Sequence, residues 1–157
     1  PAPELAREWL AQQGVADADA LLSMVGGAPL AALALAADEN RPLREFTLKQ
    51  LAAGPQCDAF ACAEALQKLP VPIVLGWLQR WLYDLLAERT AHRPRYFPAA
   101  ARDLAHCAQR IDANAFARYM KTVARERAVE NHPLNARLVF EALFLGYREL
   151  FVQSAHA

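Results

Sequence analysis

The segment "PIVLGWLQRWLYDLLAER", residues 72–89, decides the fold class of this chain. Apolar side chains cover most of a helix drawn through it, and the polar residues that interrupt them, Arg80, Asp84 and Glu88, recur at a spacing of four. A helix that is apolar on nearly all sides is stable only when other helices enclose it. We therefore expect residues 72–91 to form the central helix of an all-α fold.

The rest of the chain also carries helical patterns, and no segment alternates with the period of two that is typical of strands. Glycines and prolines mark the expected helix ends, because glycine follows many helices and proline is tolerated in the first turn. In addition to the central helix, the predicted helices cover residues 4–13, 18–25, 29–37, 42–52, 58–69, 99–109, 113–130 and 134–153.

The expected helices before residue 40 are short and too few to bury a convincing core without a partner. Asp17 is expected to cap the second of them, and Gly26 and Gly27 to end it. The last helix, in "HPLNARLVFEALFLGYRELF" at residues 132–151, is apolar over more than half of its circumference. Such a helix is either enclosed by its own bundle or shared with a neighbouring subunit.

Composition narrows the class of function. The chain has 157 residues, with 17 Lys and Arg against 17 Asp and Glu, and this balance argues against free-standing DNA binding. Its three cysteines predict a reducing cytoplasm, and Arg80 and Asp84 interrupt the best candidate for a membrane span. The first residue is Pro1 rather than Met, which we interpret as a sign of a fragment of a longer protein.

The cysteines and histidines do not have the spacing of a zinc site. Cys57 and Cys62 are separated by four residues and His106 adjoins Cys107, but no second close pair completes a ligand set. We expect no metal, and we interpret the thiols as buried or surface groups. The remaining histidines are expected to be solvated, at His92, His132 and His156.

Catalytic patterns are also missing from the sequence. Serine occurs only at Ser23 and Ser154, and neither lies in a nucleophile-elbow context. The Gly26-Gly27 pair lacks the lysine of a phosphate-binding loop, and Asp38 and Glu39 lie together in an expected linker. We therefore predict that this chain is not an enzyme and holds no cofactor.

A basic cluster recurs at helical spacing in one segment, at Arg118, Lys121 and Arg125. Such a cluster forms a solvated face or ion pairs with another subunit, and contact with phosphates is the alternative. The sequence leaves these interpretations open.

The segment "GAPLAALALA", Gly27 to Ala36, resembles the second sensor motif in the lid of AAA+ ATPases. That motif runs Gly-Ser-x-Arg-x-Ala-Leu, and Leu30 occupies the arginine position here. Arginine at this position would bind nucleotide phosphates through charge-assisted hydrogen bonds, which leucine cannot form. The resemblance therefore implies a lid that closes over no catalytic phosphate.

Residues 74–98 and 132–151 resemble the C-terminal region of the delta-prime family of clamp-loader subunits of bacterial DNA polymerase III. In that family a tryptophan-rich helix precedes a basic loop, and Asn-x-Arg-Leu opens the last helix. The matching residues here are Trp77, Trp81, Arg93 and Asn135-Ala136-Arg137-Leu138.

This resemblance implies that residues 1–40 are an AAA+ lid and residues 41–157 a collar domain, which packs with other collars into a ring. It implies a non-hydrolysing stator subunit in the bacterial cytoplasm. Its partners would be the gamma/tau and delta subunits of the loader, and DNA would be contacted only indirectly. The family's arginine finger and zinc module belong to an N-terminal domain that lies outside this sequence.

We predict that contacts with other subunits come from polar residues on otherwise apolar helix faces. Asn135 has an alternative role as a helix cap. Two other functions remain open: a catalytically active gamma-type loader subunit, against which Leu30 argues, and a helical-repeat adaptor that binds a peptide, against which the missing repeat argues. The predicted contact residues are Arg80, Tyr83, Asn135, Arg137, Tyr147 and Arg148.

Overall fold

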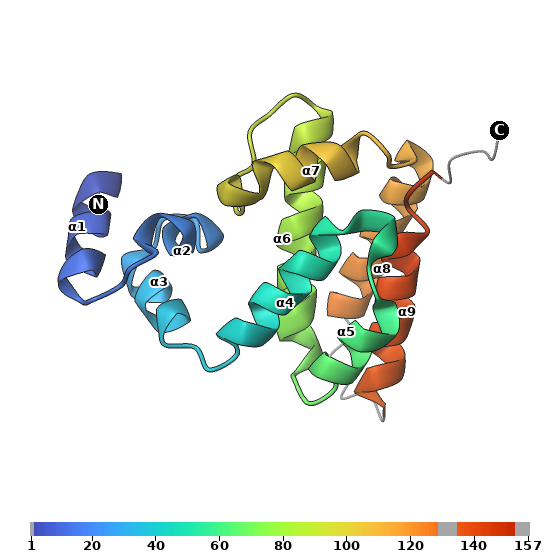
Figure 1. The fold of residues 1–157 in the computed structure, drawn as a ribbon, viewed down its shortest axis with the longest axis horizontal. Helices are drawn as coiled ribbons and strands as arrows, with labels where there is room; N and C mark the ends of the chain where they lie inside the picture. Colours follow the sequence, from blue (N-terminus) through green and yellow to red (C-terminus); the bar gives the residue numbers. More distant parts are fainter. Residues whose placement is uncertain (1, 129–134, 153–157) are drawn as a thin grey trace.

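The computed structural model describes residues 2–128 and 135–152. Within them the fold is all-α, as the sequence predicts, and the strand-like pairing is confined to one bridge between Ile111 and Phe151. Figure 1 shows the arrangement. In chain order the helices are α1 (Pro3–Gln12), α2 (Ala18–Met24), α3 (Pro29–Ala36), α4 (Arg41–Ala52), η1 (Gly54–Gln56), α5 (Ala59–Leu66), α6 (Val71–Arg89), η2 (Pro98–Ala100), α7 (Ala101–Ala108), α8 (Ala113–Ala128) and α9 (Ala136–Arg148).

Helices α1, α2 and α3 form an N-terminal unit at one end of the elongated molecule (Figure 1). Positive φ angles at Gly14, Gly26 and Gly27, which glycine adopts at little cost, end α1 and α2 as expected. Asp17 precedes α2, but its carboxylate makes no cap hydrogen bond, so that prediction was wrong. The unit has a small core of its own, made of Ala6, Leu10, Leu21, Leu22 and Ala32.

Helices α4 to α9 form a bundle around a second, larger core. Helix α6 packs against α4, α7 and α8, while α5 packs mainly against α9. The central position expected for α6 is confirmed by its many buried side chains, which are Val74, Leu75, Trp77, Leu78, Trp81, Leu82, Asp84 and Leu85.

Helix α9 buries one face in the bundle and leaves the other open. Phe140, Leu143, Phe144 and Tyr147 are buried on its inner face, whereas Leu138 is exposed. The helix ends at Arg148 and not at residue 153, because the next residues leave it to pair with the loop before α8. There the amide of Val152 donates to the carbonyl of Arg110 (2.7 Å). Residues 129, 130, 134 and 153, also included in the predicted helices, lie outside the described residues.

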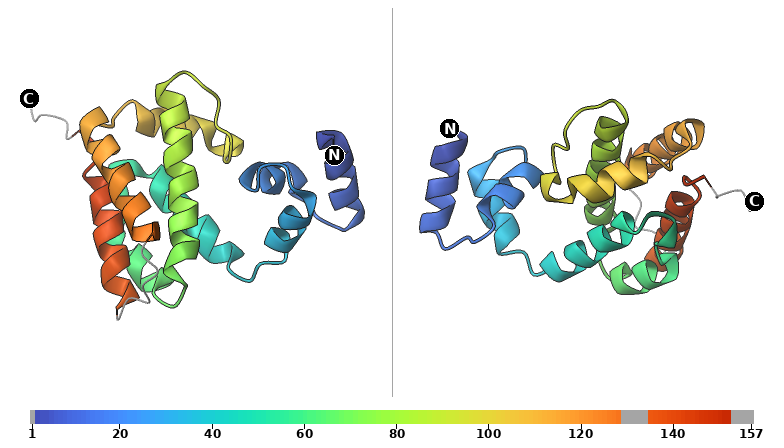
Figure 2. Two further views of the ribbon diagram at one scale, coloured as in Figure 1. Left: turned by 180° about the vertical axis from the view of Figure 1, so that it is seen from behind. Right: turned by 45° about the horizontal axis from the view of Figure 1, so that its top comes forward.

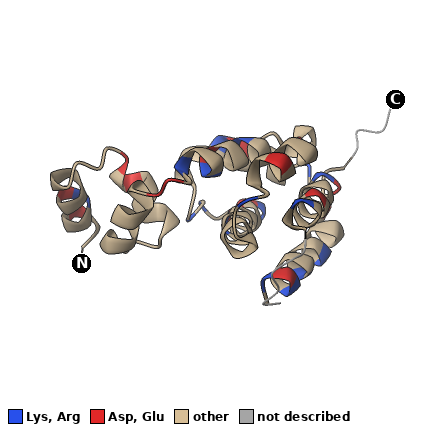
Figure 3. Cartoon of the chain, turned by 90° about the horizontal axis from the view of Figure 1, so that it is seen from below, with Lys and Arg blue, Asp and Glu red and all other residues tan. Residues whose placement is uncertain are grey.

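The two cores are separate clusters, and Met24 packs against both of them. The link between α3 and α4 runs from the N-terminal unit to the bundle, and Figure 3 shows its acidic residues. The predicted boundary at residue 40 falls in this link. Its interpretation as the boundary between a lid and a collar stays a prediction.

No single helix among the described residues is long and apolar enough to cross a membrane. Helices α2 and α3 pass that test only when taken together, and they are bent by 112°.

Candidate interaction surfaces

Tyr147 lies in the core and not on a surface. Its side chain is fully buried, and its hydroxyl accepts from Nε1 of Trp81 (3.0 Å) and donates to the carbonyl of Leu51 (2.7 Å). Burial raises the pKa of this hydroxyl, which keeps it neutral. We therefore remove Tyr147 from the predicted contact residues, because its side chain cannot reach a partner.

Asp84 departs from the polar line expected on α6. It is fully buried, and its carboxylate accepts hydrogen bonds from the backbone amides of Arg95 (2.8 Å), Tyr96 (3.0 Å) and Phe97 (2.7 Å). A buried carboxylate is tolerated when its oxygens are satisfied in this way. Asp84 thus attaches the loop before η2 to α6. On a helical wheel Asp84 lies on the same face as Trp77 and Trp81, and this position was the sequence signal that could have revealed its burial.

The attached loop builds an aromatic surface beside α6. The ring of Tyr96 meets Tyr83 edge to face, with 5.4 Å between ring centroids, and the guanidinium of Arg95 lies 5.4 Å from the Tyr96 ring centre. Tyr83 is 45% exposed and stays available for contact with another protein. Tyrosine and arginine together are common in binding surfaces.

Arg80 lies where the bundle meets the N-terminal unit. It is half-buried and lines a cavity of about 40 Å³ between this unit and the bundle. The other lining residues come from both units and are Met24, Val25, Leu35, Arg44, Trp77 and Phe97.

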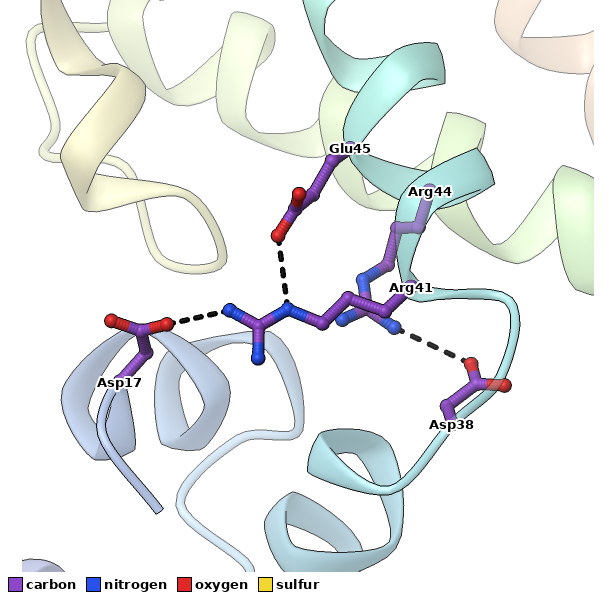
Figure 4. Close-up of polar contacts among 5 residues, drawn as sticks. All are labelled: Asp17, Asp38, Arg41, Arg44 and Glu45. Atoms are coloured by element: carbon purple, nitrogen blue, oxygen red, sulfur yellow. Dashed lines mark hydrogen bonds and ion pairs between the residues drawn. The ribbon is translucent and has the colours of Figure 1, made fainter.

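Arg41 joins the two units through exposed ion pairs (Figure 4). Its guanidinium pairs with Asp17 on the N-terminal unit (2.6 Å) and with Glu45 one turn along α4 (3.0 Å). These hydrogen bonds raise the pKa of Arg41. Pairs of this exposure contribute about 0–1 kcal/mol each, so they orient the units more than they hold them.

Arg44 is a buried residue at the same joint, the region where α4 meets the N-terminal unit. It is 3% exposed, its Nη1 lies 3.4 Å from a carboxylate oxygen of Asp38, and its Nε has no hydrogen-bond partner within the described residues. Burial lowers the pKa of Arg44, and Asp38 opposes that shift. Sequence analysis missed it, although its spacing from Thr47 and Leu51 places all three on one face of α4.

The predicted contact residues on α9 lie at opposite ends of that helix. Asn135 caps the first turn, as its alternative role predicted, by accepting from the amide of Leu138 (3.3 Å). Arg137 is exposed and pairs with Glu141 (3.1 Å). Arg148 is exposed at the other end, where it lines an open hollow of about 490 Å³. The predicted residues therefore do not form one continuous surface.

A groove with a volume of about 630 Å³ lies between α8 and α9. Figures 1 and 2 place these helices at the end of the molecule farthest from the N-terminal unit. Ala142 on the α9 side is small and exposed, and Leu138, which is 60% exposed, stands at one end of the groove. The groove is lined by Ala115, Arg118, Tyr119, Thr122, Glu126, Leu138, Val139, Ala142, Leu143, Gly146, Glu149 and Leu150.

The basic cluster of α8 lies on the outside of the bundle. Arg118, Lys121 and Arg125 are all exposed, and none of them makes an ion pair with any other described residue. Arg118 faces the groove, while Lys121 and Arg125 do not line it. At the 3.6-residue period of α8 the three side chains share one face, so the cluster runs along the edge of the groove and only Arg118 enters its lining.

The cysteines are buried free thiols. Interaction between the neighbouring thiols lowers the pKa of Cys57 and raises that of Cys62, and burial raises the pKa of Cys107 to about 11. No His, Cys, Asp or Glu in residues 2–128 and 135–152 belongs to a group that could hold a metal ion. His132 and His156 lie outside the described residues.

The N-terminal unit exposes apolar side chains. Leu5 on α1 is exposed, and Leu30 in the first turn of α3 is 74% exposed. Both leave apolar surface in water that another protein surface could cover.

Comparisons with known proteins identify no relative. No family model matches this chain, and neither a curated protein nor a solved structure does so. The class that these observations define is an all-α protein of two helical units, with candidate surfaces for other proteins.

Proposed function

We propose that this chain is the lid and collar part of a non-hydrolysing stator subunit of a bacterial clamp loader, and that it acts in DNA replication by binding other subunits. Its partners are the gamma/tau and delta subunits, and it contacts DNA only through the assembly. The chain performs no catalysis and holds no cofactor in this function, which takes place in the bacterial cytoplasm.

The observation that carries the proposal is Leu30. This residue lies in the first turn of α3, where the AAA+ resemblance expects an arginine, and its side chain extends into water. A leucine at this position offers no charge to a phosphate and leaves an apolar contact for an adjoining domain. A gamma-type active subunit would need the arginine, so this position favours the stator.

The N-terminal unit supports the same proposal. Its core consists of small residues and three leucines, and Leu5 and Leu30 remain exposed beside it. Such a unit gains stability by packing against a further domain, as a lid does. The Arg41–Asp17 pair and buried Arg44 connect it to the bundle, so a domain that binds the N-terminal unit would be coupled to the bundle.

The test is co-elution of this chain with purified gamma-type and delta-type loader subunits in size-exclusion chromatography, with and without ATP. We expect a stable complex that does not depend on ATP. Failure to form any complex at concentrations well above micromolar would refute the proposal.

Substitutions then locate the contact. Tyr83, Arg137 and Arg148 remain exposed, so we expect an alanine at one or more of them to weaken the complex by about tenfold or more if it is a binding hot spot. Lys68, which is exposed on the turn after α5, provides a control position outside the predicted contact residues. If all three variants bind like the parent, these residues do not make the contact.

A further inference from the structure

We propose that the groove between α8 and α9 is a self-association surface, in which a second copy of this chain docks about a two-fold axis. The groove holds about 630 Å³ and has an apolar floor. Ala142 on the α9 side is small and exposed, whereas the ring of Tyr119 from the same chain covers Gly146. The volume and the apolar lining do not identify what binds in the groove. We infer the occupant from the charges at the rim.

Three rim residues on α8 form a self-complementary series. Arg118, Thr122 and Glu126 follow each other at a spacing of four and all line the groove. Eight residues of helix separate the two charges by about 12 Å along its axis. A two-fold axis at Thr122 sets the two α8 helices antiparallel, so that Arg118 of each copy lies opposite Glu126 of the other.

The same Arg118–Glu126 pair forms twice across the axis, so all four charges have a partner. A two-fold interface requires such repeated contacts. Arg118 and Glu126 are exposed, and neither makes an ion pair elsewhere in the described part of the chain. Because they lie on one rigid helix, their spacing does not depend on a loop.

The second acidic rim residue fits the same arrangement. The amide of Asp112, just before α8, donates to the carbonyl of Leu150 (2.9 Å), so the end of α9 lies beside the start of α8. Glu149 is therefore at the Arg118 end of the groove. Arg118 would then lie between Glu149 of its own chain and Glu126 of the second copy.

The mixed rim also argues for a second copy over a charged peptide. One arginine and two glutamates line the groove, so neither a strongly basic nor a strongly acidic segment would be complemented along its whole length. A second copy presents the same charges in reverse order. Its docking also removes the exposed Leu138 of each copy from water.

The test is the oligomeric state of the chain, measured by sedimentation equilibrium at low salt across micromolar to millimolar concentrations. We expect a monomer–dimer equilibrium. Arg118→Glu and Glu126→Arg should each raise the dimer dissociation constant at least tenfold. The double variant R118E/E126R should recover part of this loss, because the reversed charges still pair across the axis while Glu149 repels the glutamate placed at position 118.

A mixture of the two single variants provides the sharpest measurement. In a heterodimer of R118E with E126R, both contacts bring a glutamate opposite an arginine, so we expect the mixture to associate when neither variant does so alone. Lys121→Glu is the matched control, since it makes the same charge change on α8 at an exposed position that does not line the groove and lies about 100° around the helix from Thr122, and it should alter the dissociation constant less than threefold. Circular dichroism checks that each variant remains helical.

A chain that stays monomeric throughout this concentration range would overturn the inference. So would a dimer that is indifferent to Arg118→Glu, or single variants that neither the double variant nor the mixture rescues. The inference does not rest on the proposed function, because no loader subunit is present in these experiments.

Discussion

Trp81 connects three helices through one chain of hydrogen bonds. Its indole donates to the hydroxyl of Tyr147 on α9, and that hydroxyl donates to the carbonyl of Leu51 on α4. The indole ring also packs at a tilt against Phe97, with 5.9 Å between ring centroids. Removal of this side chain therefore combines a cavity with the loss of one of the two hydrogen bonds of the buried Tyr147 hydroxyl.

We expect Trp81→Ala to lower the free energy of unfolding by about 3–5 kcal/mol, as truncations of buried aromatic residues do. Urea denaturation followed by circular dichroism measures this loss. Tyr83→Ala on the same helix is the control, with a smaller loss of about 1 kcal/mol or less, because its ring is partly in water. Equal losses for the two variants would contradict our account of the core.

We predict that the hydrogen bonds accepted by the Asp84 carboxylate hold the loop before η2 in place. In Asp84→Asn the amide nitrogen replaces one acceptor and faces backbone N–H donors, so we expect a loss of about 1.5–3 kcal/mol. Hydrogen exchange should speed up at the amides of Arg95, Tyr96 and Phe97. Glu88→Gln, one turn further along α6, is the control and should leave these amides protected.

At the scale of the elements, two glycines differ in whether the local structure needs a residue without a side chain. Gly54 has a φ of +60°, and a Cβ there would lie 3.3 Å from Cε1 of Phe151. Gly76 is within α6, and the nearest group to a Cβ there is the terminal nitrogen of Arg80 at 3.4 Å, which can move. The first glycine serves the turn after α4, while the second weakens its helix.

We predict that Gly54→Ala destabilises the fold by about 1–2 kcal/mol, the cost of a left-handed conformation with a side chain. Gly76→Ala should stabilise it by about 0.5–1 kcal/mol, because alanine loses less backbone entropy in a helix. Chemical denaturation of both variants provides the measurement. A stabilising Gly54→Ala would mean that the turn adopts another conformation.

Helix positions were largely predictable from the sequence, whereas some helix ends were not. The glycines after α1 and α2, Pro29 at the start of α3 and the Asn135 cap act within a few residues of themselves, so the local pattern reveals them. The end of α9 depends on pairing with the distant loop before α8, which no local pattern records.

At the scale of the whole molecule, the joint between the two units depends on a buried arginine whose pairing is incomplete. Asp38→Ala leaves Arg44 without its carboxylate, and we expect a loss of about 1–2 kcal/mol, reduced from the usual cost for buried pairs because Asp38 is partly exposed. Hydrogen exchange should become faster in α2 and α3 while α6 keeps its protection.

The double variant D38A/R44M distinguishes a pairing effect from general damage. It replaces the buried charge by an apolar chain of similar length, so we expect it to recover most of the stability lost in the single variant. Asp17→Ala removes the exposed pair with Arg41 and should cost less than about 1 kcal/mol. If it costs more than Asp38→Ala, the exposed pair carries the joint.

The sequence by itself determined that this protein is all-α, where its helices lie and that α6 is central, because helical periodicity and the glycine and proline signals act over a few residues. Only the tertiary structure decided the places of Tyr147, Asp84 and Arg44, and the groove between α8 and α9. The physical reason is that periodicity reveals that one face of a helix is covered, but does not reveal what covers it. That depends on contacts between residues far apart in the chain.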